Sequence, residues 1–150
     1  MIKFRPFDSR DLIDLGLQEA QKTVEHLVTT DDEHGKFCMM SEMAWTGFIG
    51  DDVVGAAGIL RNDDHKGQCW MVLSDKEFTM REWGQISVKT KEVIDQAHEL
   101  GMWRIWACVL LGHLSGERFV KHLGFSPEGT MHHSSPMGEH EILYAKIDFR

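Results

Sequence analysis

The chain has 150 residues, of which 42% are hydrophobic and 27% are charged, and its formal net charge is −8. These values are ordinary for a soluble globular protein, so we expect one domain over residues 1–150. The acidic balance argues against generic nucleic-acid binding, which needs clustered Lys and Arg. The charged N-terminus and the lack of a membrane-length apolar run indicate a cytoplasmic protein with no signal peptide and no membrane partner.

The first part of the chain predicts a strand, helical structure and then a meander. Residues 2–5 alternate apolar and polar side chains before Pro6, and Asp8 is a suitable N-cap for a helix to about Leu27. A turn or second helix start at 29–33 and an ambiguous Met-rich piece at 37–45 follow. Strands are expected at 46–49, 53–60 and 68–74, and the Gly- and Asp-rich turns between them favour antiparallel hairpins.

The second part contains the clearest helix, residues 81–100, whose apolar residues form one stripe and which ends before Gly101. Residues 102–111 are almost continuously apolar, which predicts a central strand covered on both faces. A short helix at 114–123 precedes Gly124, and strands are expected at 125–131 and 141–147. A strand leads into this helix, whose first turn contains Arg81 and Gly84. The N-terminus of the helix is a candidate anion site, because the N–H groups of a first turn lack partners within the helix.

The cysteine and histidine residues do not predict a metal site. Cys38, Cys69 and Cys108 are widely spaced, which favours buried free thiols in a reducing compartment. The spacing of three further residues, His132, His133 and His140, fits no familiar zinc pattern, so we expect no metal.

The chain resembles the GNAT acetyltransferase superfamily in three features. These are the order of the elements, the Arg81-x-x-Gly84 that opens the central helix, and the Gly124-Phe125 that closes the later helix. The resemblance implies an α/β fold of the α+β kind, with a mixed, mostly antiparallel sheet of about six or seven strands flanked by about four helices. It also implies acetyl-CoA as cosubstrate. The family pattern is Arg/Gln-x-x-Gly-x-Gly/Ala, and the bulky Ile86 stands at its last, small position.

The resemblance assigns two sets of cofactor contacts. Backbone N–H groups of the helix opening would hold the pyrophosphate, and a splayed strand would lend backbone groups to the pantetheine arm. The residues at these positions are Met71, Val72 and Leu73 in the strand and Arg81, Glu82, Trp83, Gly84, Gln85 and Ile86 in the helix opening.

Residues 117–125 are similar to the family's later helix, with departures at the catalytic positions. Val120 stands where many members carry the Tyr that protonates the leaving thiolate, and His113 stands where many carry an Asn that contacts the cofactor. The stretch 67–75, with the Arg118-Phe119-x-Lys121-x-x-Gly124 spacing, looks like small GNAT-like proteins of short-tailed bacteriophages, including an internal virion protein family. That likeness implies a phage origin and virion proteins as partners.

Acyl transfer to an amine needs a base, a polarised carbonyl and protonation of the thiolate. Asp75, Glu77 and His113 are the candidate catalytic residues, and each is also readable as a solvated loop or capping residue. Two hypotheses stay open. One is direct acetyl transfer from acetyl-CoA to an amine acceptor, a protein among the candidates. The other is a fold without chemistry that serves as a virion or host-interaction protein, in the host cytoplasm or the particle.

Overall fold

A computed structural model describes residues 1–12, 15 and 43–149. Most of the helix predicted from Asp8 to about Leu27 lies outside the described residues, as do the segment 29–42 and Cys38. Near its start, the chain forms a short 3-10 helix, η1 (Ser9–Leu12), and the Asp8 carboxylate accepts the N–H of Arg10.

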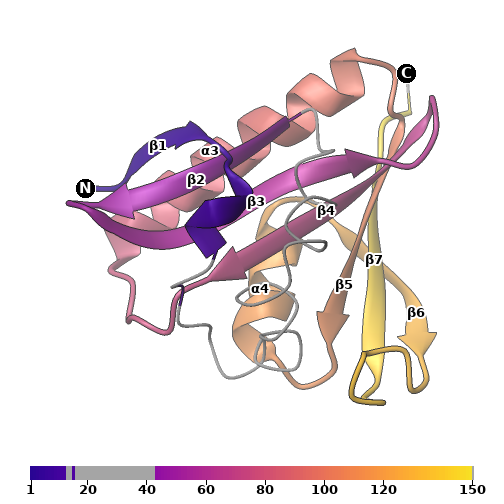
Figure 1. Ribbon diagram of the computed structural model, residues 1–150. Coiled ribbons are helices and arrows are strands. Elements are labelled where there is room, and N and C mark those ends of the chain that lie inside the picture. The colour runs from indigo at the N-terminus through magenta and orange to yellow at the C-terminus, as the bar shows by residue number, and fades with distance from the viewer. Residues whose placement is uncertain (13–14, 16–42, 150) are drawn as a thin grey trace.

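The described residues form one seven-stranded sheet in the order β1-β2-β3-β4-β5-β7-β6 (Figure 1). Every neighbouring pair is antiparallel except β4 and β5, which are parallel. The prediction of a mixed, mostly antiparallel sheet of six or seven strands is confirmed. The strands are β1 (Lys3–Pro6), β2 (Met43–Ile49), β3 (Asp52–Arg61), β4 (Lys66–Leu73), β5 (Arg104–Leu110), β6 (Ser126–Met131) and β7 (Glu141–Ile147).

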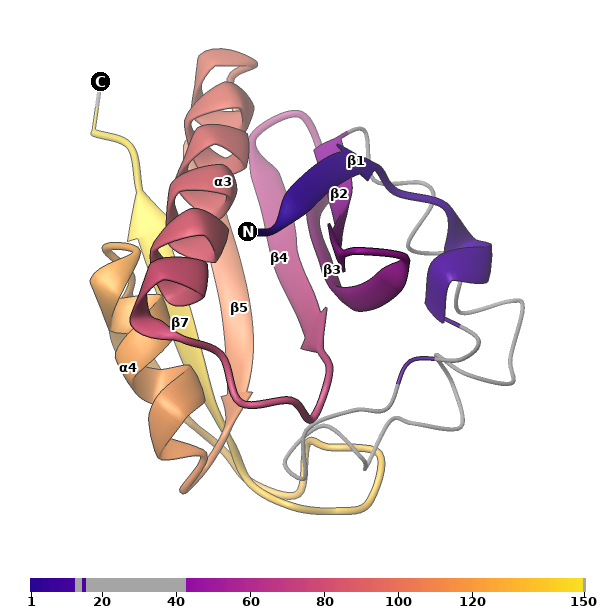
Figure 2. The same cartoon turned by 90° about the vertical axis from the view of Figure 1, so that its left-hand side faces the viewer.

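Two α-helices, α3 (Met80–Glu99) and α4 (Leu114–His122), cover one face of the sheet, and η1 lies on the other face (Figure 2). The expected count of about four flanking helices is not matched by the described residues, which hold these two α-helices and the one-turn η1. Within the described chain, no helix combines the length and the apolar character needed to cross a bilayer.

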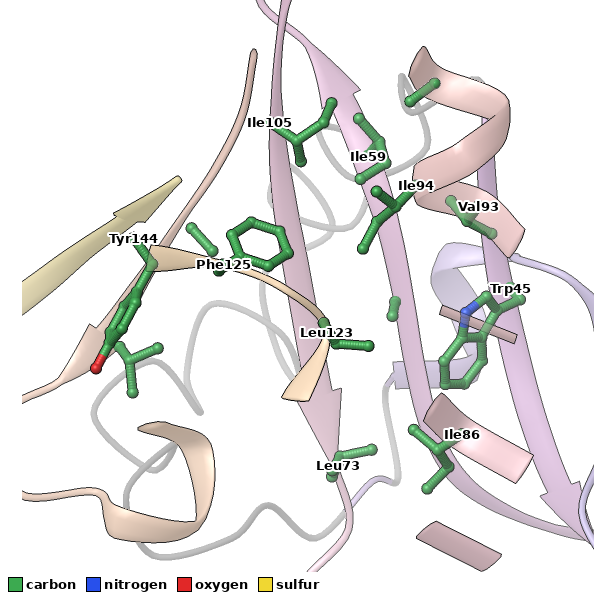
Figure 3. Packing of buried hydrophobic residues seen from close by; sticks show 14 of the residues in the cluster. Trp45, Ile59, Leu73, Ile86, Val93, Ile94, Ile105, Leu123, Phe125 and Tyr144 are labelled. Atoms are coloured by element: carbon green, nitrogen blue, oxygen red, sulfur yellow. The ribbon is translucent and has the colours of Figure 1, made fainter. Parts of the chain in front are cut away.

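The main core lies between the sheet and the two α-helices (Figure 3). α3 contributes its predicted stripe, including Ile86, Val93 and Ile94, and Gly101 follows the C-cap with a φ of 93°, as expected for a C′ glycine. Burial of each large aliphatic side chain stabilises the fold by about 1.5–3 kcal/mol. A smaller cluster on the opposite face joins Leu12 of η1 to Ala56 and Val72.

The burial of β5 differs from the sequence prediction. The strand is central, as predicted, but its residues alternate between half-buried and buried, with Ile105, Ala107 and Val109 in the core. Trp106 lies on the other face, where its indole N–H donates to the Asn62 side chain at 2.7 Å. The apolar run therefore contains a half-exposed face that hydropathy alone does not separate from a buried one.

Candidate functional site

The two parallel strands at the centre of the sheet pair over a short distance and then diverge. Residues 66–68 of β4 pair with residues 104–106 of β5. Beyond them, these two fully described strands do not pair and move apart (Figure 1). The rest of each strand, residues 69–73 and 107–110, forms what we call the splay. Along the splay, the backbone of β4 is therefore not paired with β5.

The backbone of β4 alternates in direction along the splay. Ser74 donates its N–H to the Val54 carbonyl at 2.9 Å, and antiparallel pairing with β3 continues back along β4. Because hydrogen-bonded pairs alternate in an antiparallel ladder, Val72 is directed toward β3, whereas the backbone groups of Met71 and Leu73 are directed toward β5. Of the three residues predicted to meet the pantetheine arm, Met71 and Leu73 are therefore directed toward β5 and Val72 is not; the contact with such an arm stays a prediction.

The loop after β4 leads into a helix that begins before the predicted phosphate-binding segment. α3 begins at Met80 with Thr79 as N-cap, and the Trp83 N–H already donates to the Thr79 carbonyl at 2.9 Å. The N–H groups of residues 84–86 therefore fall inside the helix, where intrahelical bonds use them. Those of Met80 and Arg81 remain at the first turn.

A carboxylate lies at this helix end. Glu82 accepts the Thr79 N–H at 2.9 Å and the Lys76 ammonium at 3.0 Å, while its own N–H donates to the Thr79 hydroxyl at 3.2 Å. This reciprocal capping box leaves the Glu82 side chain 13% exposed. The Thr79 N–H, and after it Lys76, hold the pKa of Glu82 below its usual value. The negative end of the box therefore occupies the part of the helix where a phosphate would be most stabilised.

The three candidate catalytic residues lie on two loops. Asp75 and Glu77 are exposed between β4 and α3, and His113 is the N-cap residue of α4, just beyond the end of β5. No hydrogen bond or ion pair joins any two of them in the described part of the chain. Burial lowers the pKa of His113, with the nearby Glu117 carboxylate opposing the shift, so the imidazole is neutral near pH 7.

The His113 ring has a defined seat on its own helix. A Cβ built on Gly116 would lie 2.4 Å from the ring carbon Cδ2, so the imidazole occupies the space that the glycine leaves open. The Ser115 hydroxyl lies 3.5 Å from Nδ1. A neutral imidazole held this way can accept a proton and, as the imidazolium, pass it on.

Comparison with solved structures decides the fold. An acetyltransferase of the GNAT family from Streptococcus pneumoniae matches with a TM-score of 0.72 at 16% identity, covering 98% of this chain and 99% of that one. Ard1 from Thermoplasma volcanium matches with a TM-score of 0.73 at 16% identity, covering 99% of each chain. Aminoglycoside 6′-acetyltransferase type Ii matches with a TM-score of 0.69 at 16% identity, covering 97% and 96%. The chain has the GNAT fold.

Sequence comparisons add nothing to this result. No protein-family model matches the chain, and no curated protein matches it. At these identities, likeness to solved structures establishes the GNAT fold and leaves the activity to be argued from the residues.

The side chains of the predicted phosphate-binding segment have separate roles. Ile86 is 1% exposed and points into the core, so its bulk is directed away from the helix end. The Gln85 side chain accepts the Ile2 N–H at 3.0 Å. A Cβ on Gly84 would meet open space, and the exposed Arg81 makes no ion pair with any described residue. Arg81 and Gly84 are therefore the exposed residues of this segment, and Arg81 alone of these two offers a side-chain group.

Three aromatic rings connect α3 to α4 beside this segment. Trp83 lies 5.4 Å from Phe78 and 5.5 Å from Phe119, measured between ring centroids, and the Lys76 ammonium lies 4.8 Å from the Phe78 ring centroid. Such tilted contacts add to the burial of the rings. Trp83 thus joins the loop before α3 to α4, a structural role that the sequence did not reveal.

Two buried polar residues, Tyr144 and Ser74, were not predicted from the sequence as part of the site. Tyr144, the single tyrosine, is 1% exposed on β7, and its hydroxyl interacts with the Glu117 carboxylate of α4. Burial and the Glu117 carboxylate raise its pKa. Ser74 is buried, and its hydroxyl has no hydrogen-bond partner in the described structure. A lone Tyr in the apolar strand 141–147 was a readable signal, whereas nothing local marks Ser74.

The histidine-rich hairpin between β6 and β7 is held by its own contacts. The His133 N–H donates to Nδ1 of His140 at 3.0 Å, and the His133 ring contacts the Gly138 carbonyl at 2.7 Å. The described residues contain no group of three or more His, Cys, Asp or Glu side chains arranged to hold a metal ion. The hairpin is better described as a turn stabilised by imidazole hydrogen bonds.

Proposed function

We propose that the protein is an N-acyltransferase that transfers an acetyl group directly from acetyl-CoA to an amine acceptor. The observation that carries the proposal is the divergence of the parallel strands β4 and β5 beside the N-terminus of α3, within a GNAT fold. The divergence directs the backbone groups of Met71 and Leu73 toward the splay, where a thioester arm with amide groups would lie.

The site fits the two parts of the acyl donor, the pantetheine arm and the phosphates, unequally. The direction of the β4 backbone suits the pantetheine arm. The helix end offers the N–H groups of Met80 and Arg81 and the Arg81 side chain, but Glu82 already uses the capping position. The arm therefore fits better than the phosphates, and the bound donor supplies the activated acyl group.

The chain's own residues supply the proton transfers. The ammonium of the acceptor must lose a proton before it attacks, and the thiolate must gain one as it leaves. Asp75 and Glu77 are exposed carboxylates near the end of β4 and suit the first role. The half-buried neutral His113 also suits the first role, and the imidazolium it becomes can then fill the second. Val120 has no proton to give. The acceptor is an amine on a small molecule or on a protein.

Calorimetric titration with acetyl-CoA tests the proposal. We expect binding that weakens when Arg81→Ala removes the exposed guanidinium, and that persists in the matched control Arg118→Ala, which changes charge equally on α4. The same pair should differ in acetyl transfer to a panel of amines. If a folded sample binds no acetyl-CoA at millimolar concentration, the proposal is wrong.

A second proposed function follows from the groups at the helix end. A carboxylate at the α3 N-terminus and Val120 on α4 both oppose the chemistry, and they favour a protein that keeps the fold and acts by contact, as a virion or host-interaction component. Its phage origin rests on the sequence likeness of residues 67–75. Acetyl transfer that is lost in Arg81→Ala would reject it.

A further inference from the structure

The Glu82 carboxylate is held in place from two directions. Thr79 donates its N–H at 2.9 Å and Lys76 its ammonium at 3.0 Å, both to the same oxygen, Oε2. The side chain is 13% exposed, so the contact is shielded from water on most sides. These contacts satisfy one N–H of the helix end with a charge that belongs to the chain itself.

The charges around this helix end also oppose an anion. From Asp75 to Glu82 the segment has three carboxylates against the two cations Lys76 and Arg81, and Lys76 is already paired with Glu82. An anionic ligand is stabilised at a helix N-terminus by its N–H groups and its dipole, and a fixed carboxylate there reduces both contributions.

We propose that Glu82 competes internally with the phosphates of the acyl donor and so sets the affinity of the site for phosphate-bearing donors. This inference rests on the proposed acyltransferase function. Lys76 is the group that a displaced Glu82 would release, and with Arg81 it would then face the ligand phosphates. Donors that reach the splay without phosphates are unaffected by Glu82.

The test compares two probes on three proteins. Acetyl-CoA has the phosphates, and acetylpantetheine has the same thioester arm without them. Glu82→Gln removes the charge and keeps an oxygen that can accept the Thr79 N–H, so the capping box and the fold are retained. Glu77→Gln is the matched control, because it removes an equal charge from an exposed neighbour that has no capping role.

We expect Glu82→Gln to bind acetyl-CoA about tenfold more tightly than the wild type, with a difference that shrinks as salt is added. Glu77→Gln should change the affinity by less than about twofold, since its charge is exposed. The affinity for acetylpantetheine should be the same in all three proteins. A gain of affinity cannot arise from misfolding, so the experiment is protected against that artefact.

The outcomes separate the inference from the proposed function. Acetyl-CoA binding by the wild type that is unchanged in Glu82→Gln contradicts the inference alone, as does an equal gain in Glu77→Gln. Binding by Glu82→Gln without measurable binding by the wild type supports the inference and contradicts the proposal that the wild type is an acetyltransferase. If neither protein binds acetyl-CoA at millimolar concentration, both are rejected.

Discussion

Gly84 offers a direct test of whether the segment 81–86 is helix or phosphate-binding loop. It lies inside α3, is exposed, and a Cβ added to it meets no atom within 4 Å. Replacement of an exposed helical Gly by Ala removes backbone freedom from the unfolded chain and stabilises by about 0.8–1.0 kcal/mol. For a domain of this size that is a rise in Tm of about 2–4 °C.

Gly84→Ala should therefore be more stable in urea denaturation, with an unchanged m-value. Gly116→Ala is the control, because this helical glycine is blocked by the His113 ring, which would have to move. We expect Gly116→Ala to gain less than Gly84→Ala and to shift the NMR signals of His113. Destabilisation by Gly84→Ala would refute the reasoning, since it would mean that residue 84 is not in an open helical position.

The same variant also reports on ligand approach. If a donor lies against the outward face of Gly84, the added methyl group should weaken acetyl-CoA binding while stability rises. Higher stability with unchanged affinity would mean that the glycine does not contact the donor, and would leave the N–H groups of Met80 and Arg81 as the candidate contacts. The two readouts separate a folding effect from a binding effect.

Three further predictions concern buried or paired polar groups. Ser74→Ala should leave the free energy of unfolding unchanged or higher, because the buried Ser74 hydroxyl has no hydrogen-bond partner among the described residues. The control is Ser135, which is equally 8% exposed but whose hydroxyl accepts a backbone N–H at 2.9 Å. Ser135→Ala should lose about 1 kcal/mol in urea denaturation. Glu82 has a lowered pKa in the fold, so its stabilisation is present above its unfolded pKa of about 4.3 and is lost as the pH falls; the difference in Tm between wild type and Glu82→Gln should shrink from about pH 6 to about pH 3. Tyr144→Phe should cost about 0.5–1.5 kcal/mol because it removes the interaction of the buried hydroxyl with Glu117, and an unchanged free energy of unfolding would contradict that interaction.

Local patterns in the sequence were enough to predict most described elements. The strand 141–147 was predicted with the bounds that β7 has, and the stripe of α3 identified the residues that enter the core. These elements depend on side-chain periodicity and turn residues, which are local properties. The place of β7 between β5 and β6, and the point where β4 leaves β5, depend on contacts between distant segments and had no local signal.

The start of α3 shows how a small boundary error changes a functional reading. The helix was predicted to open at Arg81, which placed the N–H groups of residues 81–86 at the helix end, where they could hold a pyrophosphate. It begins at Met80, and Thr79-Met80-Arg81-Glu82 matches the Ser/Thr-x-x-Glu signature of a capping box. That signature is local to the sequence and predicts a carboxylate at the helix end.

Binding, more than proton transfer, separates the two proposed functions. General acid catalysis contributes about 10²–10⁴-fold to a rate, and a thiol with a pKa of about 8.5 leaves as a comparatively stable anion. The absence of a proton donor at Val120 would therefore slow acetyl transfer without abolishing it. A neutral His113 that takes the ammonium proton becomes an imidazolium, which can then protonate the thiolate. A carboxylate that excludes the donor acts before any chemistry can begin. Because an enzyme that does not bind its donor shows no rate at any pH, comparing the affinities of the wild type and Glu82→Gln for acetyl-CoA discriminates between the functions more sharply than the activity of Val120→Tyr would.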